Sequence, residues 1–167
     1  MVNVGLENSI ILLLFIITSI CVIGYFVSPD KKFLKVLENK TPKGASSINL
    51  IGTVMYGSKP LTREQLKYYG LEPTEWHEEY YKKYGSDLRD LPFSMRKYFP
   101  QIRTKFISIF FPLIPLQSQV VFNIEDLGIE ERFNAIPVEL YWKQVFFILS
   151  FSYGSILVIA ILISLYF

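Results

Sequence analysis

The chain has 167 residues, of which 51% are hydrophobic and 16% aromatic, and its formal net charge is +2. A mean hydropathy of +0.31 is high for a water-soluble domain and low for a protein built mainly of membrane spans, which predicts a mixed architecture. The nearly balanced charge argues against nucleic acid as a partner, since that needs a clustered basic face, and a single cysteine excludes an intrachain disulfide.

The first long apolar run lies near the N-terminus. Residues 10–28 are predicted to form a transmembrane helix behind a short tail at residues 1–9. The uncharged stretch 10–27 would extend about 27 Å as a helix, close to the thickness of a hydrocarbon core. Lysines follow this run and none precedes it, which favours an uncleaved anchor over a signal peptide. Pro29 is expected to end the helix at the membrane boundary.

Residues 29–142 are predicted to form an extramembrane region that is irregular and only partly helical. Its lysine-rich beginning, residues 31–43, fits a short amphipathic helix on the membrane surface and a solvated linker equally well. The apolar, β-branched stretch 48–56 predicts an extended segment, and the alternation in 117–123 predicts a short strand.

Three short helices are predicted in this region, near residues 63–69, 75–84 and 93–99. Thr62 and Gln65 form a capping-box pattern at the start of the first helix, and Gly70 supplies its stop. Thr74 is expected to cap the second helix, whose acidic residues come first and whose lysines come last, as the helix dipole favours.

An apolar stretch, residues 106–116, follows these helices. Its sequence, FISIFFPLIPL, is interrupted by Pro112 and Pro115. It is too short and too broken to span a membrane. It is therefore expected either to lie at the membrane interface or to pack into a groove on a neighbouring protein.

Residues 143–167 are predicted to form the second transmembrane helix. The stretch 145–167 contains no charge and no proline, and as a helix it would be about 34 Å long. Cationic and aromatic residues that flank the two spans are predicted to be membrane-interface anchors: Lys31, Lys32, Tyr141, Trp142 and Lys143. Small residues along the spans are predicted to pack the helices together: Gly24, Ser28, Ser150 and Gly154.

The distribution of positive charge predicts an orientation. All 17 Lys and Arg residues lie between Lys31 and Lys143. By the positive-inside tendency, the region between the spans is expected on the matrix or cytoplasmic side, with both termini on the opposite side.

The sequence predicts no catalytic, cofactor-binding or metal-binding residue. It has one histidine, His77, and a single His without a nearby cysteine cannot build a zinc or haem site within this chain. Phosphate loops and dinucleotide-binding fingerprints are absent from the sequence. Neither span carries the ionisable residues by which transporters move charge.

Together these features predict a mainly α membrane protein, in which two transmembrane helices bracket an irregular, partly helical polar region. The expected function is that of a non-catalytic accessory subunit of a large integral membrane complex. Its expected partners are other integral membrane subunits and the lipid bilayer, with no nucleic acid and no cofactor. The alternative is a membrane-anchored enzyme or assembly factor with a small compact domain between its two anchors.

Composition also suggests a location. Alanine occurs only three times, while Phe, Ile and Tyr are frequent, a bias that AT-rich genomes such as those of organelles produce. The mitochondrial inner membrane, with a respiratory-chain or ATP-synthase complex, is therefore expected. A further alternative is a small lipid- or quinone-contacting subunit that uses Trp76, His77 and nearby tyrosines.

Overall fold

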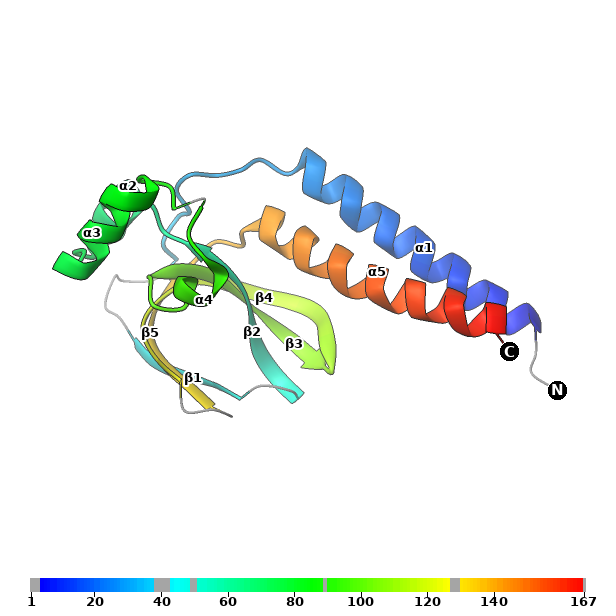
Figure 1. Cartoon of the computed structure of the whole chain (residues 1–167). Coiled ribbons are helices and arrows are strands. Elements are labelled where there is room, and N and C mark those ends of the chain that lie inside the picture. The colour runs from blue at the N-terminus through cyan, green and yellow to red at the C-terminus, as the bar shows by residue number, and fades with distance from the viewer. Residues whose placement is uncertain (1–3, 38–42, 49–50, 89, 127–129, 167) are drawn as a thin grey trace.

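The structure is a computed structural model of the whole chain, and it describes residues 4–37, 43–48, 51–88, 90–126 and 130–166. Two long helices lie side by side and extend away from a curved sheet, and short helices pack at the far side of this sheet (Figure 1). The long helices run antiparallel, so that the first begins and the second ends at the tip of the pair, far from the sheet (Figure 1).

The long helices are α1 (Val4–Val27) and α5 (Trp142–Tyr166), and both are long and apolar enough to span a membrane. In the most apolar stretch of each helix, only 6% of α1 and 11% of α5 is buried. Most of their apolar side chains therefore face outward. A core helix of a soluble protein would instead bury these side chains.

The boundaries of α1 differ from the predicted ones. Residues 4–9 belong to the helix, whereas residues 1–9 were predicted to form a tail. The helix extends into residues 4–9 because they contain no proline, and each residue added to a formed helix gains one hydrogen bond. The amide of Ser28 still donates to the carbonyl oxygen of Gly24 at 2.9 Å, and Pro29 follows. The helix therefore ends where its sequence predicts.

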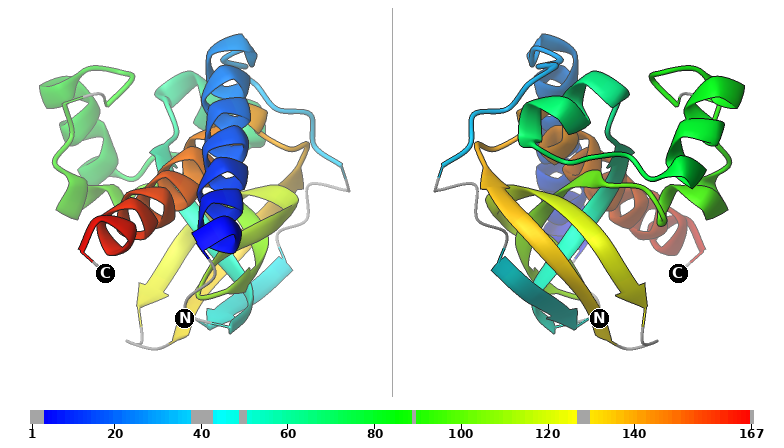
Figure 2. Two further views of the ribbon diagram at one scale, coloured as in Figure 1. Left: turned by 90° about the vertical axis from the view of Figure 1, so that its right-hand side faces the viewer. Right: turned by 90° about the vertical axis from the view of Figure 1, so that its left-hand side faces the viewer.

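A five-stranded antiparallel sheet lies between the two long helices in the sequence, in the order β1-β5-β4-β3-β2. Its strands are β1 (Lys43–Ile48), β2 (Ile51–Pro60), β3 (Gln101–Ile109), β4 (Phe111–Asp126) and β5 (Glu130–Val138). Strands β1 and β2 are consecutive in the chain but occupy opposite edges of the sheet. Because only residues 49–50 separate them, the sheet must curl until its edges approach each other, as Figure 2 shows.

The two predicted membrane-length helices are present, but the mainly α class is not confirmed, because the region between them folds into an antiparallel sheet. In β3 both faces are largely buried, so its sequence lacks the alternation of apolar and polar residues by which a strand is detected. Pro112 and Pro115, which suggested a broken segment, lie within β4. The predicted extended segment 48–56 and strand 117–123 overlap β2 and β4.

The short helices are α2 (Arg63–Tyr69), α3 (Glu75–Tyr84) and α4 (Phe93–Arg96). Thr62 and Gln65 form the predicted capping box of α2, and Gly70 ends it in the left-handed conformation, with φ 71°. Thr74 caps α3, where His77 completes the box.

Two expectations about local helices are corrected. The third short helix ends at Arg96, not at residue 99, because the chain then turns and buries Phe99 in the core. The described part of the lysine-rich segment, residues 31–37, is not a helix: Val36 forms a β-bridge to Val138, which holds this segment beside β5.

One face of the sheet carries the main hydrophobic core. Helices α2 and α3 pack there against the sheet, and the buried residues include Leu66, Tyr69 and Tyr81 from the helices and Ile102 and Val120 from the strands. A second, smaller core joins the sheet to the membrane-length helix. In it Phe106 of β3 is buried against Val145 and Ile148 of α5.

Candidate functional site at the junction of the long helices and the sheet

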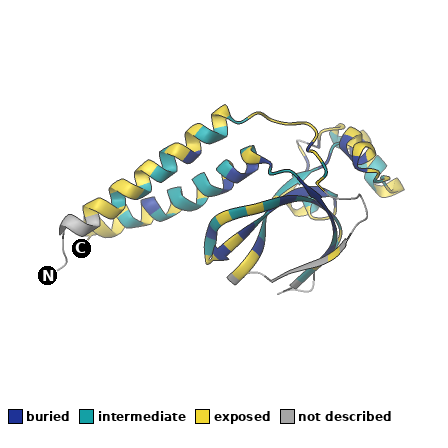
Figure 3. Ribbon diagram, turned by 180° about the vertical axis from the view of Figure 1, so that it is seen from behind, coloured by how far each residue is buried: buried dark blue, intermediate teal, exposed yellow. Residues whose placement is uncertain are grey.

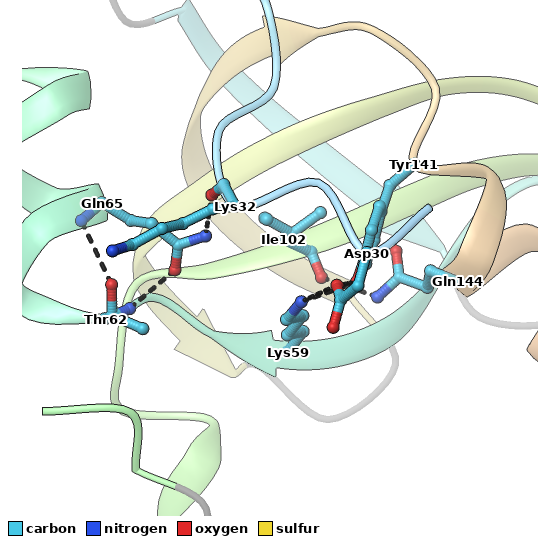
Figure 4. Close-up of polar contacts among 8 residues, drawn as sticks. All are labelled: Asp30, Lys32, Lys59, Thr62, Gln65, Ile102, Tyr141 and Gln144. Carbon is cyan, nitrogen blue, oxygen red and sulfur yellow. Dashed lines mark hydrogen bonds and ion pairs between the residues drawn. The ribbon is translucent and has the colours of Figure 1, made fainter. Parts of the chain in front are cut away.

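Buried polar side chains join the first turn of α5 to the sheet. Gln144, which is 8% exposed, donates from Nε2 to the carbonyl oxygen of Ile102 at 3.0 Å (Figure 4). Its Oε1 accepts from the hydroxyl of Thr104 at 2.7 Å. Because the Thr104 hydroxyl already donates its proton to Gln144, the Ser118 hydroxyl must donate to the Thr104 oxygen, at 2.8 Å. The Ser118 oxygen in turn accepts from the Tyr141 amide at 3.0 Å. One continuous chain of hydrogen bonds thus holds α5 to β3 and β4.

A second set of contacts connects the exits of both long helices. The Tyr141 hydroxyl donates to the carboxylate of Asp30, which follows α1 (Figure 4). Lys59 of β2 donates to Asp30 Oδ1 at 2.9 Å and to the Tyr141 hydroxyl oxygen at 2.6 Å. A β-bulge between Tyr56 and Lys59, with Gly57 at φ +89°, alters the register just before Lys59. We call Asp30, Lys59, Thr104, Ser118, Tyr141 and Gln144 the junction cluster.

The segment after α1 is held along its described length. Glu139, next to β5, accepts from Lys31 Nζ at 2.9 Å and from the Lys35 amide at 3.1 Å. The Glu139 amide donates in turn to the Lys35 carbonyl oxygen at 2.8 Å. Gln65 of α2 donates to the carbonyl oxygen of Lys32 (Figure 4). Within the described residues, both long helices are therefore joined to the sheet by hydrogen-bonded contacts.

The electrostatics of the junction follow from these contacts. Burial opposes ionisation of Asp30, but the hydrogen bonds from Tyr141 and Lys59 outweigh it and lower the pKa of Asp30. The hydrogen bonds from Lys31 and from the Lys35 amide lower the pKa of Glu139. Burial, together with donation to Asp30, raises the pKa of Tyr141 above its usual value. At neutral pH the junction therefore holds two carboxylates, their lysines and a neutral phenol.

These shifts predict that the junction weakens in acid. A carboxyl group whose pKa is lowered by folding stabilises the folded state at pH values above the pKa that it has in the unfolded chain, about 3.9 for Asp and about 4.3 for Glu. This stabilisation is lost as the pH falls through the pKa that the group has in the folded protein. We expect the melting temperature in mild detergent to fall between pH 5 and pH 3, and to fall less in the double variant Asp30→Asn/Glu139→Gln. Glu72→Gln supplies the control, because it removes one carboxylate at an exposed position outside the junction.

The predicted interface anchors occupy different environments. Lys31 pairs with Glu139, and Lys32 pairs with Glu64 of α2. Tyr141 is 4% exposed and its side chain packs in the core, so its role as an interface anchor stays a prediction. Trp142 is half-exposed and its ring lies 5.7 Å from that of Phe146. The Nζ atom of Lys143 lies 5.4 Å from the ring centre of Tyr25 on α1.

The predicted packing residues lie along α1 and α5, but they do not form one cluster. A Cβ atom at Gly24 would lie 2.7 Å from the ring of Phe146, so this glycine lets α5 approach α1. A Cβ at Gly154 would meet Thr18 at 3.7 Å, an ordinary contact. The Ser150 hydroxyl donates to the Phe146 carbonyl oxygen within its own helix at 2.6 Å. Ser28 lies just beyond the end of α1 and is half-buried.

Gly24→Ala is expected to destabilise the helix pair by about 1–3 kcal/mol, because the added methyl group overlaps an aromatic ring that packing confines. Gly154→Ala is the matched control and should be tolerated, since its methyl group fits without displacement. Thermal unfolding of the two variants in the same detergent measures the difference. Equal melting temperatures would contradict the close approach at Gly24.

The aromatic residues near His77 form a separate surface on the sheet domain. Trp76 of α3 lies 4.4 Å from the ring of Tyr80 and 5.3 Å from that of Phe99. His77 bonds through Nδ1 to Thr74 and through Nε2 to the Tyr98 carbonyl oxygen. The adjoining cavity, which His77, Tyr98 and Phe99 help to line, has about 150 Å³, less than the roughly 300 Å³ of small ligand pockets. Because α3 lies across the sheet from the long helices (Figure 1), this surface does not favour a quinone site within a membrane.

The junction cluster was not predicted from the sequence. Its strongest sequence signal is Gln144, a polar residue in the first turn of a helix that carries no charged or amide side chain after it. Asp30 directly follows Pro29 at the exit of α1, a position that suggested only the end of the helix. Thr104 and Ser118 carry no signal of their own, because their partners are distant in the sequence.

The hydrogen bonds and the ion pair of the junction cluster join both long helices to the sheet. In the part of the chain that the structure describes, no group of three His, Cys, Asp or Glu side chains could hold a metal ion. Comparisons with protein-family models, with curated protein sequences and with solved structures find no match for this chain.

Proposed function

We propose that this chain is a membrane-anchored, non-catalytic subunit of a large integral membrane complex. The observation that carries the proposal is the combination of two apolar, outward-facing helices with a junction cluster that fixes them to a folded domain. In this role α1 and α5 hold the chain in the bilayer, and the sheet domain presents a surface to other subunits.

The dimensions of the helices support the membrane part of the proposal. The 25 residues of α5 correspond to about 37 Å of helix, which exceeds a hydrocarbon core of about 30 Å. Water would solvate the exposed apolar side chains of both helices poorly, whereas lipid tails accept them. By the positive-inside tendency, the sheet domain would lie on the matrix or cytoplasmic side.

The surface of the sheet domain supports a role in assembly. Phe93 and Tyr98 are largely exposed, and Trp76 is partly exposed. Exposed aromatic side chains are enriched in protein interfaces. The low alanine content supports an organellar genome, so we place the complex in the mitochondrial inner membrane and propose a respiratory-chain or ATP-synthase assembly.

The second candidate is a membrane-anchored assembly factor or enzyme that acts on its own. The compact sheet domain favours this candidate, because its main core buries 13 residues without help from another chain. A domain with such a core has no need of a permanent partner in order to fold.

Purification in mild detergent from the native membrane distinguishes the two candidates. Co-migration of the chain with a large complex, and identification of the chains that co-purify, would support the accessory-subunit proposal. A stable monomer with a folded sheet domain would support the second candidate. Release of the chain into the soluble fraction by alkaline carbonate would contradict both, since neither allows a water-soluble protein.

A further inference from the structure

The hairpin that connects β3 and β4 ends in an exposed apolar tip, residues 106–116. Its large apolar side chains that face outward are Ile107, Ile109, Phe110, Ile114 and Leu116. Its one polar side chain, Ser108, is fully buried and bonds to the hydroxyl of Tyr56 at 2.9 Å. The pair Lys105 and Gln117 stands at its base, where the apolar stretch begins. We call residues 106–116 the hairpin tip.

The hairpin tip reaches α5 well beyond the start of that helix. Phe111 makes an edge-on contact with the ring of Tyr153, at 6.1 Å between ring centres. Tyr153 follows Trp142 by eleven residues, or about 16 Å along the helix axis. Figure 3 shows exposed residues along both long helices and at the end of this hairpin. The tip and the apolar part of α5 therefore lie at the same level.

The backbone of the hairpin tip is suited to an apolar environment. Pairing of β4 with β5 begins at Ser118, so residues 111–117 of β4 pair with β3 alone. A strand edge in lipid is costly because its amide groups lack partners. Pro112 and Pro115 carry no N–H group, so this part of β4 has two fewer backbone donors that need a partner.

The residue at the apex is a phenylalanine in a strained conformation. Phe110 connects β3 to β4 with φ +67°, in the left-handed region that Gly or Asn adopts more readily, and it is 75% exposed. Burial of the ring within the described fold does not offset this strain, because the side chain is exposed.

We propose that the hairpin tip inserts into the leaflet that α5 enters, with Phe110 in contact with lipid acyl chains and with Lys105 and Gln117 at the headgroup level. This inference rests on the proposed membrane-spanning role of α1 and α5. Lipid is favoured as the occupant because the exposed tip continues the apolar surface of α5 at the same depth. The sheet domain is thereby held against the membrane at a third point.

Nitroxide scanning of the full chain in phospholipid vesicles tests the proposal. The native cysteine is replaced by Cys21→Ser, and one label is attached in each of the variants Phe110→Cys, Phe93→Cys and Val158→Cys. Phe93 on α4 is the matched control, a phenylalanine as exposed as Phe110 but outside the hairpin tip, and Val158 reports on α5. Oxygen, which concentrates in lipid, and a water-soluble nickel chelate are the two relaxation agents.

The proposal expects labels at positions 110 and 158 to respond to oxygen more than to nickel, and the label at 93 to show the reverse. Oxygen preference at 158 with nickel preference at 110 would overturn the insertion of the tip and leave the anchor intact. Nickel preference at 158 would overturn the membrane anchor itself. A label at 110 shielded from both agents would overturn lipid as the occupant and indicate a protein partner.

A second measurement tests the role of the Phe110 side chain in a variant that is expected to keep the fold of the hairpin. Phe110→Gly relieves the backbone strain at the apex, so the variant should melt at the same temperature as the parent chain or higher. With a label at Ile109→Cys, the Phe110→Gly variant should lose part of the oxygen preference that the parent shows at this position. An unchanged oxygen preference would overturn the role of the Phe110 side chain in insertion.

Discussion

Gly57→Ala is expected to lower the free energy of unfolding by about 3–5 kcal/mol. Alanine is strained at the positive φ of this position, +89°, and the substitution also breaks buried hydrogen bonds. A Cβ atom at Gly57 would lie 2.2 Å from Gln144 Nε2. Gln144 would have to move away from the carbonyl oxygen of Ile102 and from Thr104, and both of these residues are buried. Chemical denaturation of the chain in detergent measures the loss.

Gly52→Ala is the matched control for this prediction. Gly52 lies on the same strand and also has a positive φ, +106°, but a Cβ atom there would meet nothing within 4 Å. Its replacement should cost only the conformational strain, about 1–2 kcal/mol. Equal losses at positions 52 and 57 would show that contact with Gln144 does not matter and would contradict the proposed importance of the junction cluster.

Arg103→Met is expected to destabilise the sheet domain by about 2–3 kcal/mol, because it leaves the partly buried carboxylate of Glu131 and the buried amide of Gln101 without their partner. Arg103 is 8% exposed and pairs with Glu131 of β5 across the sheet. The amide oxygen of Gln101, when turned toward the guanidinium group, accepts two further bonds at 2.9 and 3.2 Å. Unfolding of the variant, followed by circular dichroism in detergent, measures the effect.

Two further variants distinguish the effect of breaking the Arg103–Glu131 ion pair from the effect of removing a positive charge. Lys105→Met removes a positive charge from the same strand at a half-buried position and should change stability by less than about 0.5 kcal/mol. Arg103→Met/Glu131→Leu removes both charges and should recover much of the loss, since well-packed apolar residues often replace a buried ion pair without cost. A double variant as unstable as the single one would mean that the pair itself is essential to the fold.

The junction cluster supports the proposed function because it joins the two long helices to each other and to the sheet. Asp30 and Tyr141 lie at the exits of α1 and α5 and bond to each other, while Gln144 ties α5 to the sheet. A change in the spacing of the two helices would therefore act directly on the sheet domain. This connection suits a subunit whose role is to hold a domain at a defined place beside a membrane.

The sequence by itself determined the features that depend on neighbouring residues. A long uncharged run is sufficient to specify a membrane-length helix, so both long helices include the predicted spans almost completely, although α1 begins at Val4. The capping box at Thr62 and the stop at Gly70 involve groups only a few residues apart, and both are present. Each of these features is the outcome of local hydrogen bonding and local hydrophobicity.

Only the tertiary structure decided the sheet, the junction cluster and the place of the hairpin tip. The strands pair residues of 43–60 with residues of 101–138, so no local pattern specifies their register. Polar residues such as Arg103 and Thr104 look unsuited to a core until Glu131 and Gln144 are brought beside them. Burial of a polar group is favourable only when its partner is present, and here the partners come from distant parts of the chain.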